Sequence, residues 1–263
     1  RRTRVNCRLS SQFLSALLLM APCCENGLEI TVENGPVSRP YVDMTLLVME
    51  QFGVSYERRG YEWFSVPRGT YRPGRYQAES DASAAGYFWA AAAITGSSVL
   101  VRGLSPKSAQ GDVGLAFLLE RMGCRVDEEP AGIRVTGGPL VGIRADMADL
   151  PDAVPTLAVV AAFAEGTTEI ENVGHLREKE CDRLAAVTTE LGKMGISAKV
   201  IDQNLVIEGG APSPAVIDTY EDHRMAMSFA VAGLAVPGTV IRDPECVKKS
   251  FSGFWDELEK FYS

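Results

Sequence analysis

A pattern of about 70 residues recurs along this chain of 263 residues, and it restricts the possible folds more than any other feature. Four segments share one order of features: a polar cluster, an Ala-rich apolar stretch, a Gly and a β-branched stretch. Their starts are separated by 70, 71 and 70 positions, at Ser11, Asp81, Asp152 and Asp222. Self-similarity at a fixed period indicates repeated supersecondary units. The sequence therefore predicts an α/β (α+β) fold built from repeated units of helix and strand.

A second predicted helix follows each of the first three copies and ends before a Gly. These residues, Gly53, Gly123 and Gly195, are spaced by 70 and 72 positions, and Gly there fits a left-handed helix C-cap. The segment 67–77, PRGTYRPGRYQ, predicts a domain junction because it is rich in Pro, Gly and Arg. We expect one copy before this junction and three after it. The opening strand of the first copy is expected in or before residues 1–7, and the last helix within 250–263.

Composition excludes several classes of function. The net charge of −8 leaves no overall basic footprint for nucleic acid. Two histidines are too few for a histidine-rich metal site, and the six cysteines include no C-x-x-C pair. Reduced thiols are typical of a cytoplasmic protein, and no apolar run approaches the ~18 residues of a membrane span. We expect a cytoplasmic protein without a metal, a nucleic-acid partner or a membrane partner.

The first helix of each copy opens with residues that favour N-capping, and capping alone is the simplest interpretation. The fourth copy departs from this simple pattern. His223 and Arg224 follow Asp222 inside the first turn, where cations oppose the helix dipole. An anion bound at the helix start would compensate, so these residues indicate an anionic ligand.

The run HLREKECDRL at 175–184 crowds acids among cations. A solvated helix face would explain it. Alternatively, Lys179 and Arg183, four residues apart on one helix face, reach one ligand, and Glu180 transfers a proton to it. Further cations recur where loops meet helices, and each alone is explained by solvation: Arg39, Arg177, Lys248 and Lys249. Together they suggest a converging site for a polyanionic ligand.

Seven motifs, in order along the chain, resemble the 5-enolpyruvylshikimate-3-phosphate synthase family: SSQFLSALL, SRPYVDMT, ESDAS, LPDA, LREKECDRL, YEDHRMAMSFAV and DPECVKKSF. The pair KECDR and DHRMAM is the most specific part. The resemblance implies the two-lobed enolpyruvyl transferase fold, with three βαβαββ units in each lobe. It makes residues 1–75 the last unit of an incomplete N-terminal lobe and 76–263 the C-terminal lobe of three units. The chain is then expected to be a C-terminal portion that needs an N-terminal portion for activity.

The resemblance also implies an activity: transfer of the enolpyruvyl group of phosphoenolpyruvate to the 5-hydroxyl of shikimate-3-phosphate, with release of phosphate and without a metal or organic cofactor. Shikimate-3-phosphate would be bound by Ser10, Ser11, Gln12, Ser38, Asp152, His175 and Lys179. Phosphoenolpyruvate would be bound by Gln12, Arg183, Arg224 and Lys249. The catalytic groups would be Asp152, which takes the hydroxyl proton, Glu180, which shuttles the proton at the methylene carbon, and His223 beside the leaving phosphate.

Two departures and two alternatives accompany this assignment. His175 stands where some members of the family carry Asn, and Ser80 where Gly is common. One alternative is the related transferase that acts on UDP-N-acetylglucosamine, which shares the fold and phosphoenolpyruvate. The motifs SSQ, KECDR and DHRMAM favour the shikimate enzyme over it. The other alternative is a non-catalytic fragment or a substrate-binding module.

Overall fold

The computed structural model describes residues 1–261 and consists of two compact units, each considered separately here. The first unit comprises residues 1–78 with 109–111, and the second comprises 79–108 and the chain from 112 onward. Residues 67–81, which include the predicted junction, form neither helix nor strand. The unit boundary after Ala78 lies three residues beyond the boundary expected at 75.

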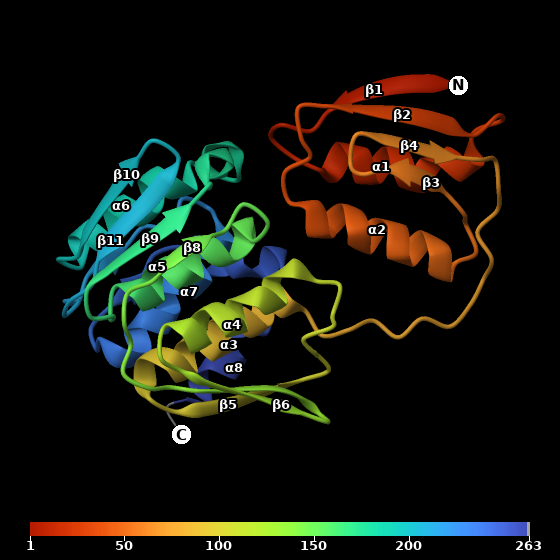
Figure 1. Ribbon diagram of the computed structural model, residues 1–263. Helices are drawn as coiled ribbons and strands as arrows, with labels where there is room; N and C mark the ends of the chain where they lie inside the picture. Colours follow the sequence, from red (N-terminus) through yellow and green to blue (C-terminus); the bar gives the residue numbers. More distant parts are fainter. Residues whose placement is uncertain (262–263) are drawn as a thin grey trace. The chain divides into compact units, whose positions relative to one another are not determined.

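The first unit is a four-stranded sheet with two helices on one face (Figure 1). Its elements are β1 (Arg2–Asn6), α1 (Gln12–Met20), β2 (Leu28–Glu33), α2 (Arg39–Gln51), β3 (Glu57–Arg59) and β4 (Trp63–Val66), with a 3-10 turn at Ala21–Cys23. The strand order is β1-β2-β4-β3, and only the pair β1–β2 is parallel. Its core packs the buried faces of the helices onto the sheet through Leu14, Leu18, Ile30, Leu46 and Phe64. β1 occupies the place where the sequence predicts the opening strand.

The second unit holds three small sheets around a bundle of helices. Its first half contains α3 (Ala82–Thr95), β5 (Ser98–Arg102), α4 (Gly114–Arg121), β6 (Arg125–Glu129), β7 (Gly132–Thr136), β8 (Arg144–Asp146), α5 (Val154–Ala161) and β9 (Thr167–Glu171). Its second half contains α6 (Arg183–Lys193), β10 (Ser197–Ile201), β11 (Asn204–Glu208), β12 (Val216–Ile217), α7 (His223–Ala235), β13 (Val240–Ile241) and α8 (Phe254–Glu259). Short 3-10 helices lie at Pro151–Ala153, Gly174–Glu178 and Pro244–Lys249, and a further one, Gly111–Val113, begins at the last residue assigned to the first unit. The last predicted helix extends to residues 262–263, which lie outside the described residues.

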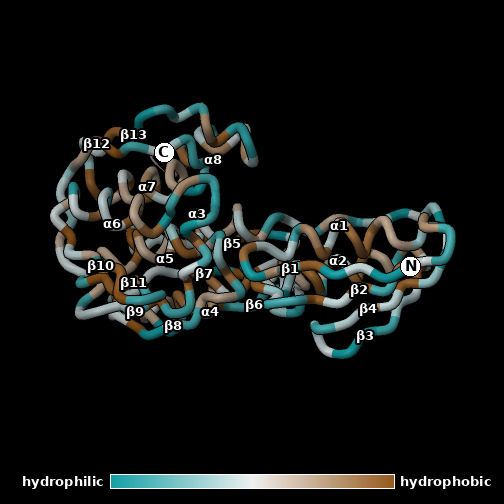
Figure 2. The backbone as a smooth tube through the Cα atoms, turned by 90° about the horizontal axis from the view of Figure 1, so that it is seen from above, coloured by the Kyte–Doolittle hydropathy of each residue, from teal (hydrophilic) through white to brown (hydrophobic). Residues whose placement is uncertain are grey.

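The helices α3, α5 and α7 contact one another at the centre of the second unit. All eight residues of α5 are buried, as are nine of the fourteen residues of α3. Helices that are apolar on every side belong in a core rather than on a surface. Figure 2 shows much of α5 and α7 in shades of brown. The starts of all three helices therefore place their polar side chains beside a buried apolar core.

The sheet β8-β9-β11-β10 of the second unit matches the sheet of the first unit in strand order and direction. Its first two strands, β8 and β9, are parallel, and the pairs β9–β11 and β10–β11 are antiparallel. The Gly residues predicted as helix C-caps all have positive φ: +79° at Gly53, +111° at Gly123 and +80° at Gly195. Within residues 1–261, no helix has the length and apolar character needed to cross a bilayer.

Candidate functional site

A buried arginine at the first position of α6 organises a cluster of carboxylates in the second unit. The Arg183 side chain is 1% exposed, and each of its three nitrogens meets a different acid. Nε donates to Asp222 Oδ2 at 2.7 Å, Nη1 to Asp152 Oδ1 at 2.8 Å and Nη2 to Glu180 Oε2 at 2.8 Å. Glu180 is three residues from Arg183 in sequence, whereas Asp152 and Asp222 come from the starts of other elements, so the fold brings these two acids to Arg183.

The expectation that Lys179 and Arg183 share one helix face is wrong. Residues 174–178 form a 3-10 helix that ends at Lys179, whose backbone is extended, with φ −97° and ψ −154°. The α-helix begins only at Arg183, because the Asp182 side chain accepts the amide of Ala185 at 3.0 Å and fixes the N-cap. Glu180 therefore lies before α6 rather than on it. This geometry lets Glu180 fold back onto the guanidinium three residues later.

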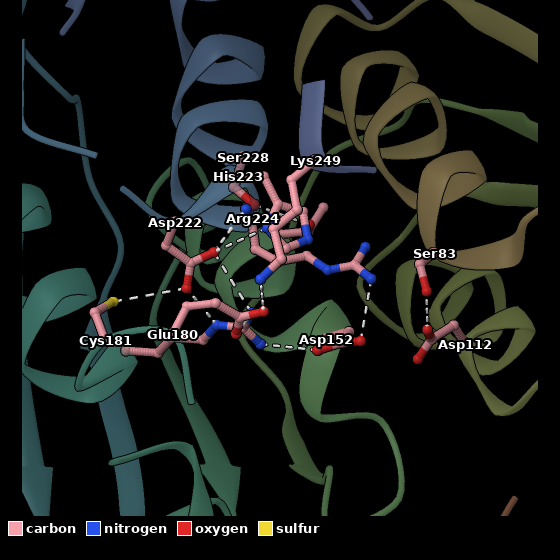
Figure 3. Close-up of polar contacts among 12 residues, drawn as sticks. Ser83, Asp112, Asp152, Glu180, Cys181, Asp222, His223, Arg224, Ser228 and Lys249 are labelled. Carbon is pink, nitrogen blue, oxygen red and sulfur yellow. Dashed lines mark hydrogen bonds and ion pairs between the residues drawn. The ribbon is translucent and has the colours of Figure 1, made fainter. Parts of the chain in front are cut away.

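Each carboxylate oxygen of Asp152 accepts a hydrogen bond from a different arginine, which distinguishes Asp152 from the acids that cap helices. In addition to Arg183 on one oxygen, Arg224 Nη2 donates to its other oxygen at 3.1 Å (Figure 3). The capping interpretation is confirmed for Asp81 and Asp222, whose side chains accept amides of their own helices at 3.0 and 2.8 Å. Asp152 lies in the 3-10 turn Pro151–Ala153, ahead of α5, and both of its oxygens bind arginine side chains. Its carboxylate is therefore held for contact with the cations.

Two lysines lie at the same cluster, and only one of them forms an ion pair with a described residue. Lys249 Nζ, in the 3-10 helix before α8, contacts Glu180 Oε1 at 2.7 Å, and its side chain is 55% exposed (Figure 3). Lys179 forms neither a hydrogen bond nor an ion pair with any of residues 1–261, although it is partly buried. Burial lowers its pKa, and Asp152 opposes that shift. An ammonium group in this position is available for an anionic ligand.

The carboxylates of Asp152 and Glu180 remain ionised. Burial disfavours the charge of Asp152, but Arg224 and Arg183 outweigh it and hold the pKa of that carboxyl well below its usual range. Burial likewise opposes ionisation of Glu180, but the hydrogen bond from Lys249 and the charge of Arg183 lower its pKa to about 2. With three acids and four cations, the cluster has an excess of one positive charge when all groups are ionised. It suits a ligand that carries negative charge.

Both histidines of the chain lie beside this cluster. Burial, with Lys179 as the second cause, lowers the pKa of His175 to about 4, and burial with Arg224 lowers the pKa of His223. One ring nitrogen of each, Nε2 of His175 and Nδ1 of His223, is buried without a hydrogen-bond partner among residues 1–261. Neutral imidazoles with an unsatisfied nitrogen can donate to, or accept from, a ligand hydroxyl or phosphate.

The four predicted residues of the first unit gather at one edge of its sheet. Since β1 and β2 are parallel and pair up to Asn6 and Glu33, both strands deliver the chain to helix starts at the same edge. Gln12 is the first residue of α1, Ser11 is its N-cap and Ser10 precedes it. Ser38, at φ +55°, is the N-cap of α2. The Ser38 hydroxyl is buried without a partner within residues 1–261, and Ser11 is 4% exposed. This unit thus presents its own group of hydroxyls.

Sequence reasoning missed two residues of the cluster. Asp222, predicted only as a helix cap, is completely buried and also binds Arg183 and the thiol of Cys181, whose Sγ donates at 3.6 Å. Tyr87, inside α3, is buried and accepts Arg224 Nη1 at 3.1 Å. The position of Asp222 directly before His223 and Arg224 was a usable signal for this residue. A tyrosine within an Ala-rich apolar stretch gave none.

Comparisons with known proteins agree with this geometry. A family model described as EPSP synthase (3-phosphoshikimate 1-carboxyvinyltransferase) matches residues 1–258. The 3-phosphoshikimate 1-carboxyvinyltransferase of Syntrophobacter fumaroxidans is 50% identical, over 98% of this chain and 62% of its own length. That of Methanoculleus marisnigri is 44% identical, over 98% and 61%. The chain thus spans about three fifths of the length of these relatives.

Solved structures show the same fold. An EPSP synthase from Acinetobacter baumannii matches with a TM-score of 0.81 at 29% identity, over 99% of this chain and 62% of that one. The enolpyruvyl transferase NikO from Streptomyces tendae matches with a TM-score of 0.75 at 23% identity, which bears on the fold alone. The mixed α/β enolpyruvyl transferase fold expected from the sequence is confirmed at this level. The chain belongs to the EPSP synthase (3-phosphoshikimate 1-carboxyvinyltransferase) family.

Proposed function

We propose that this chain contributes the Arg183-centred cluster to an enzyme that transfers the enolpyruvyl group of phosphoenolpyruvate to the 5-hydroxyl of shikimate-3-phosphate and releases phosphate. The observation that carries the proposal is Asp152, an ionised carboxylate held by two arginines beside a lysine without an ion-pair partner. Family membership supports the reaction class. Because the chain spans 62% of its first relative, activity of the whole enzyme remains part of the proposal.

Asp152 would take the proton of the 5-hydroxyl, and Lys179 and His175 would contact the same substrate. With Arg183 and Arg224 on its two oxygens, Asp152 is a weak base. Phosphoenolpyruvate bound at Arg224 would neutralise part of that positive potential and raise the pKa of Asp152. In this account the base becomes effective when the second substrate is present, which limits proton removal to the complete complex.

Glu180 would carry the proton to and from the methylene carbon. Lys249 and Arg183 each hold one of its oxygens, so it can exchange one partner without losing the other. Protonation at the methylene carbon develops positive charge on the adjacent carbon, which the hydroxyl then attacks. His223, neutral because of its burial and Arg224, would lie near the leaving phosphate. Arg224 and Lys249 would neutralise that phosphate as it leaves.

The structure qualifies the role proposed for Arg183 as a ligand for phosphoenolpyruvate. All three of its nitrogens already bind carboxylates, so a direct contact requires one acid to move away. Glu180 is the candidate, because it is the most exposed of the three acids and Lys249 can hold it alone. Gln12, on the first unit, and Arg224 and Lys249 complete the proposed set for phosphoenolpyruvate.

The larger organisation is proposed in the same terms. Ser10, Ser11, Gln12 and Ser38 would bind shikimate-3-phosphate, supported by their shared edge and the buried hydroxyl of Ser38. The segments of about 70 residues would be copies of one βαβαββ unit, supported by two sheets of identical strand order. Residues 1–75 would end an N-terminal lobe, and 76–263 would form a C-terminal lobe. A further N-terminal portion for turnover and a cytoplasmic location complete the proposal.

Ligand binding by the 263-residue chain tests the proposal, also against the alternative that acts on a UDP-amino sugar. Calorimetry should show weak binding of shikimate-3-phosphate at millimolar concentration and none of UDP-N-acetylglucosamine. Lys179→Met should weaken that binding roughly tenfold, because one charge-assisted contact is lost, whereas Lys199→Met, on an exposed strand position, should not. A folded sample that gives no heat with shikimate-3-phosphate would contradict the proposal.

A further inference from the structure

A second buried acid lies on α6, away from the residues discussed so far. Glu190 is 0% exposed and accepts four hydrogen bonds. Lys193 Nζ donates to both carboxylate oxygens at 2.8 and 2.7 Å, the amide of Asp218 donates at 3.1 Å and the hydroxyl of Tyr220 at 2.7 Å. A buried carboxylate is tolerated only when it is paired and fully hydrogen-bonded. Two of these donors belong to a segment outside α6.

That segment, 218–222, contains two consecutive left-handed residues just before α7. Tyr220 has φ +56° and Glu221 has φ +57°. Residues other than Gly rarely adopt this backbone conformation, because their Cβ crowds the backbone. It persists only where the surrounding structure imposes it. The next residue, Asp222, caps α7 by accepting the amide of Arg224 at 2.8 Å. The path of this turn therefore determines where His223 and Arg224 begin their helix.

Residues of α6 bind this turn before and after its two left-handed residues. Arg183 and Glu190 are seven residues apart, which is two helical turns and places them on one face. Arg183 binds the Asp222 carboxylate at 2.7 Å, and Glu190 binds Asp218 and Tyr220. The left-handed residues lie between these two attachments. The Tyr220 residue is 41% exposed, so its hydroxyl bond rather than burial of its ring attaches it to Glu190.

We propose that Glu190 is a positioning residue, which through Tyr220 and Asp218 imposes the left-handed turn that directs His223 and Arg224 into the site. It touches neither the Arg183 cluster nor the reacting groups assigned above. The competing explanation is that Glu190 and Lys193 merely stabilise the end of α6. The two explanations differ in what happens at His223, which is 33 positions from Glu190 in sequence and is joined to it through the turn.

The chain contains two histidines, His175 and His223, so its imidazole NMR spectrum follows each of them by a separate signal. Glu190→Gln and Tyr220→Phe should shift the His223 signal and leave the His175 signal in place. The pKa of His223 is lowered by burial and by Arg224, with Asp222, Glu180 and Arg183 also facing it. Release of the turn should raise that pKa toward its ordinary value, while the pKa of His175 stays unchanged. This readout needs no ligand.

Matched controls separate positioning from stability. Tyr71→Phe removes a hydroxyl that donates to the carbonyl of Leu19 at 2.7 Å in the first unit, and Glu208→Gln neutralises an exposed acid at the end of β11. Neither should move either histidine. Tyr220→Phe is the decisive variant, because it deletes one hydroxyl and leaves the Glu190–Lys193 pair intact. An unchanged His223 in folded Tyr220→Phe and Glu190→Gln samples would overturn the proposal, as would equal shifts of both histidines.

A second arm measures binding of phosphoenolpyruvate and rests on the proposed function. Tyr220→Phe should weaken binding of phosphoenolpyruvate about threefold to tenfold, since a small displacement of a charged contact is costly, and should change binding of shikimate-3-phosphate less. Wild-type chain that binds neither substrate would refute the proposed function while the histidine signals still decide the role of Glu190. Equal loss of both affinities would assign Glu190 to stability alone and would contradict positioning.

Discussion

At the scale of single residues, the cluster depends on one guanidinium that compensates three carboxylates. Arg183 and Asp222 are 1% and 0% exposed, so neither can regain solvation if its partner is removed. Removal of one partner from a buried ion pair leaves an uncompensated charge, which costs far more than the net stabilisation that the pair contributes. Arg183 is therefore needed for the folded site itself, in addition to any contact with a ligand.

Arg183→Ala should lower the free energy of unfolding by about 3–5 kcal/mol. The control is Arg144→Ala, which removes an arginine that is 68% exposed and pairs with Glu171 on the surface. That change should cost no more than about 1 kcal/mol. Urea unfolding of the 263-residue chain measures both. Equal, small losses would show that the cluster is solvated and that Arg183 does not organise it.

The depressed pKa of Glu180 predicts a specific dependence of stability on pH. Its folded-state pKa, about 2, lies below that of an unfolded chain, ~4.3, so the ionised group stabilises the fold above pH ~5. This contribution is lost as the pH falls through the window from about 5 to 2. In Glu180→Gln, the free energy of unfolding should fall by on the order of 1 kcal/mol less than in the wild type across this window, allowing for solvent screening. Identical slopes for wild type and variant across this window would contradict the assignment.

Several acids and cations that the sequence singled out meet in the second unit, but their contacts differ from the expected ones. His223 and Arg224 were recognisable because two cations in the first turn of a helix oppose its dipole. The sequence did not predict that all three nitrogens of Arg183 bind carboxylates. The acids involved lie up to 70 residues apart and meet only in the folded unit: Asp152, Glu180 and Asp222. Spacing along a supposed helix gave a wrong geometry for Lys179, because an N-cap at Asp182 delays the helix start. Capping competes with periodicity, and here it decided the local structure.

At the scale of elements, the repeated pattern predicts which helices and strands form, whereas tertiary contacts decide how strongly each position is constrained. The C-cap glycines illustrate this difference. Gly123 and Gly195 occupy equivalent positions after α4 and α6, and both have positive φ. A Cβ at Gly123 would lie 2.2 Å from the carbonyl oxygen of Pro139, whereas a Cβ at Gly195 would meet nothing within 4 Å.

Gly195→Ala should therefore cost only the left-handed conformation, roughly 1 kcal/mol. Gly123→Ala should cost about 3 kcal/mol or more, since the backbone at Pro139 must also move. Thermal or urea unfolding of the two variants compares the same substitution at matched positions. Similar destabilisation at both sites would mean that the contact with Pro139 relaxes freely and that conformation alone determines the need for Gly.

At the scale of the whole molecule, two separate hydrophobic cores account for the two units. The core of the second unit is built on the apolar helices α3, α5 and α7, and that of the first on α1, α2 and one sheet. The Pro-, Gly- and Arg-rich segment predicted this division, because such a segment forms no packed element of its own. Relative placement of the units does not follow from periodicity or composition, which report only on local structure and burial.

The central claim is that the Arg183-centred cluster, through Glu180, performs enolpyruvyl transfer. Phosphate release in the presence of both substrates tests this claim most directly. A chimaera in which the N-terminal portion of the Syntrophobacter fumaroxidans relative precedes Arg1 would supply the portion that the proposed function requires, since this chain covers 62% of that relative. In this chimaera Glu180→Gln should reduce kcat about 10²–10⁴-fold, as expected for loss of an acid–base group. Glu178→Gln, an exposed acid of the same run, should leave kcat unchanged. Equal kcat for both variants and the unsubstituted chimaera would contradict the account.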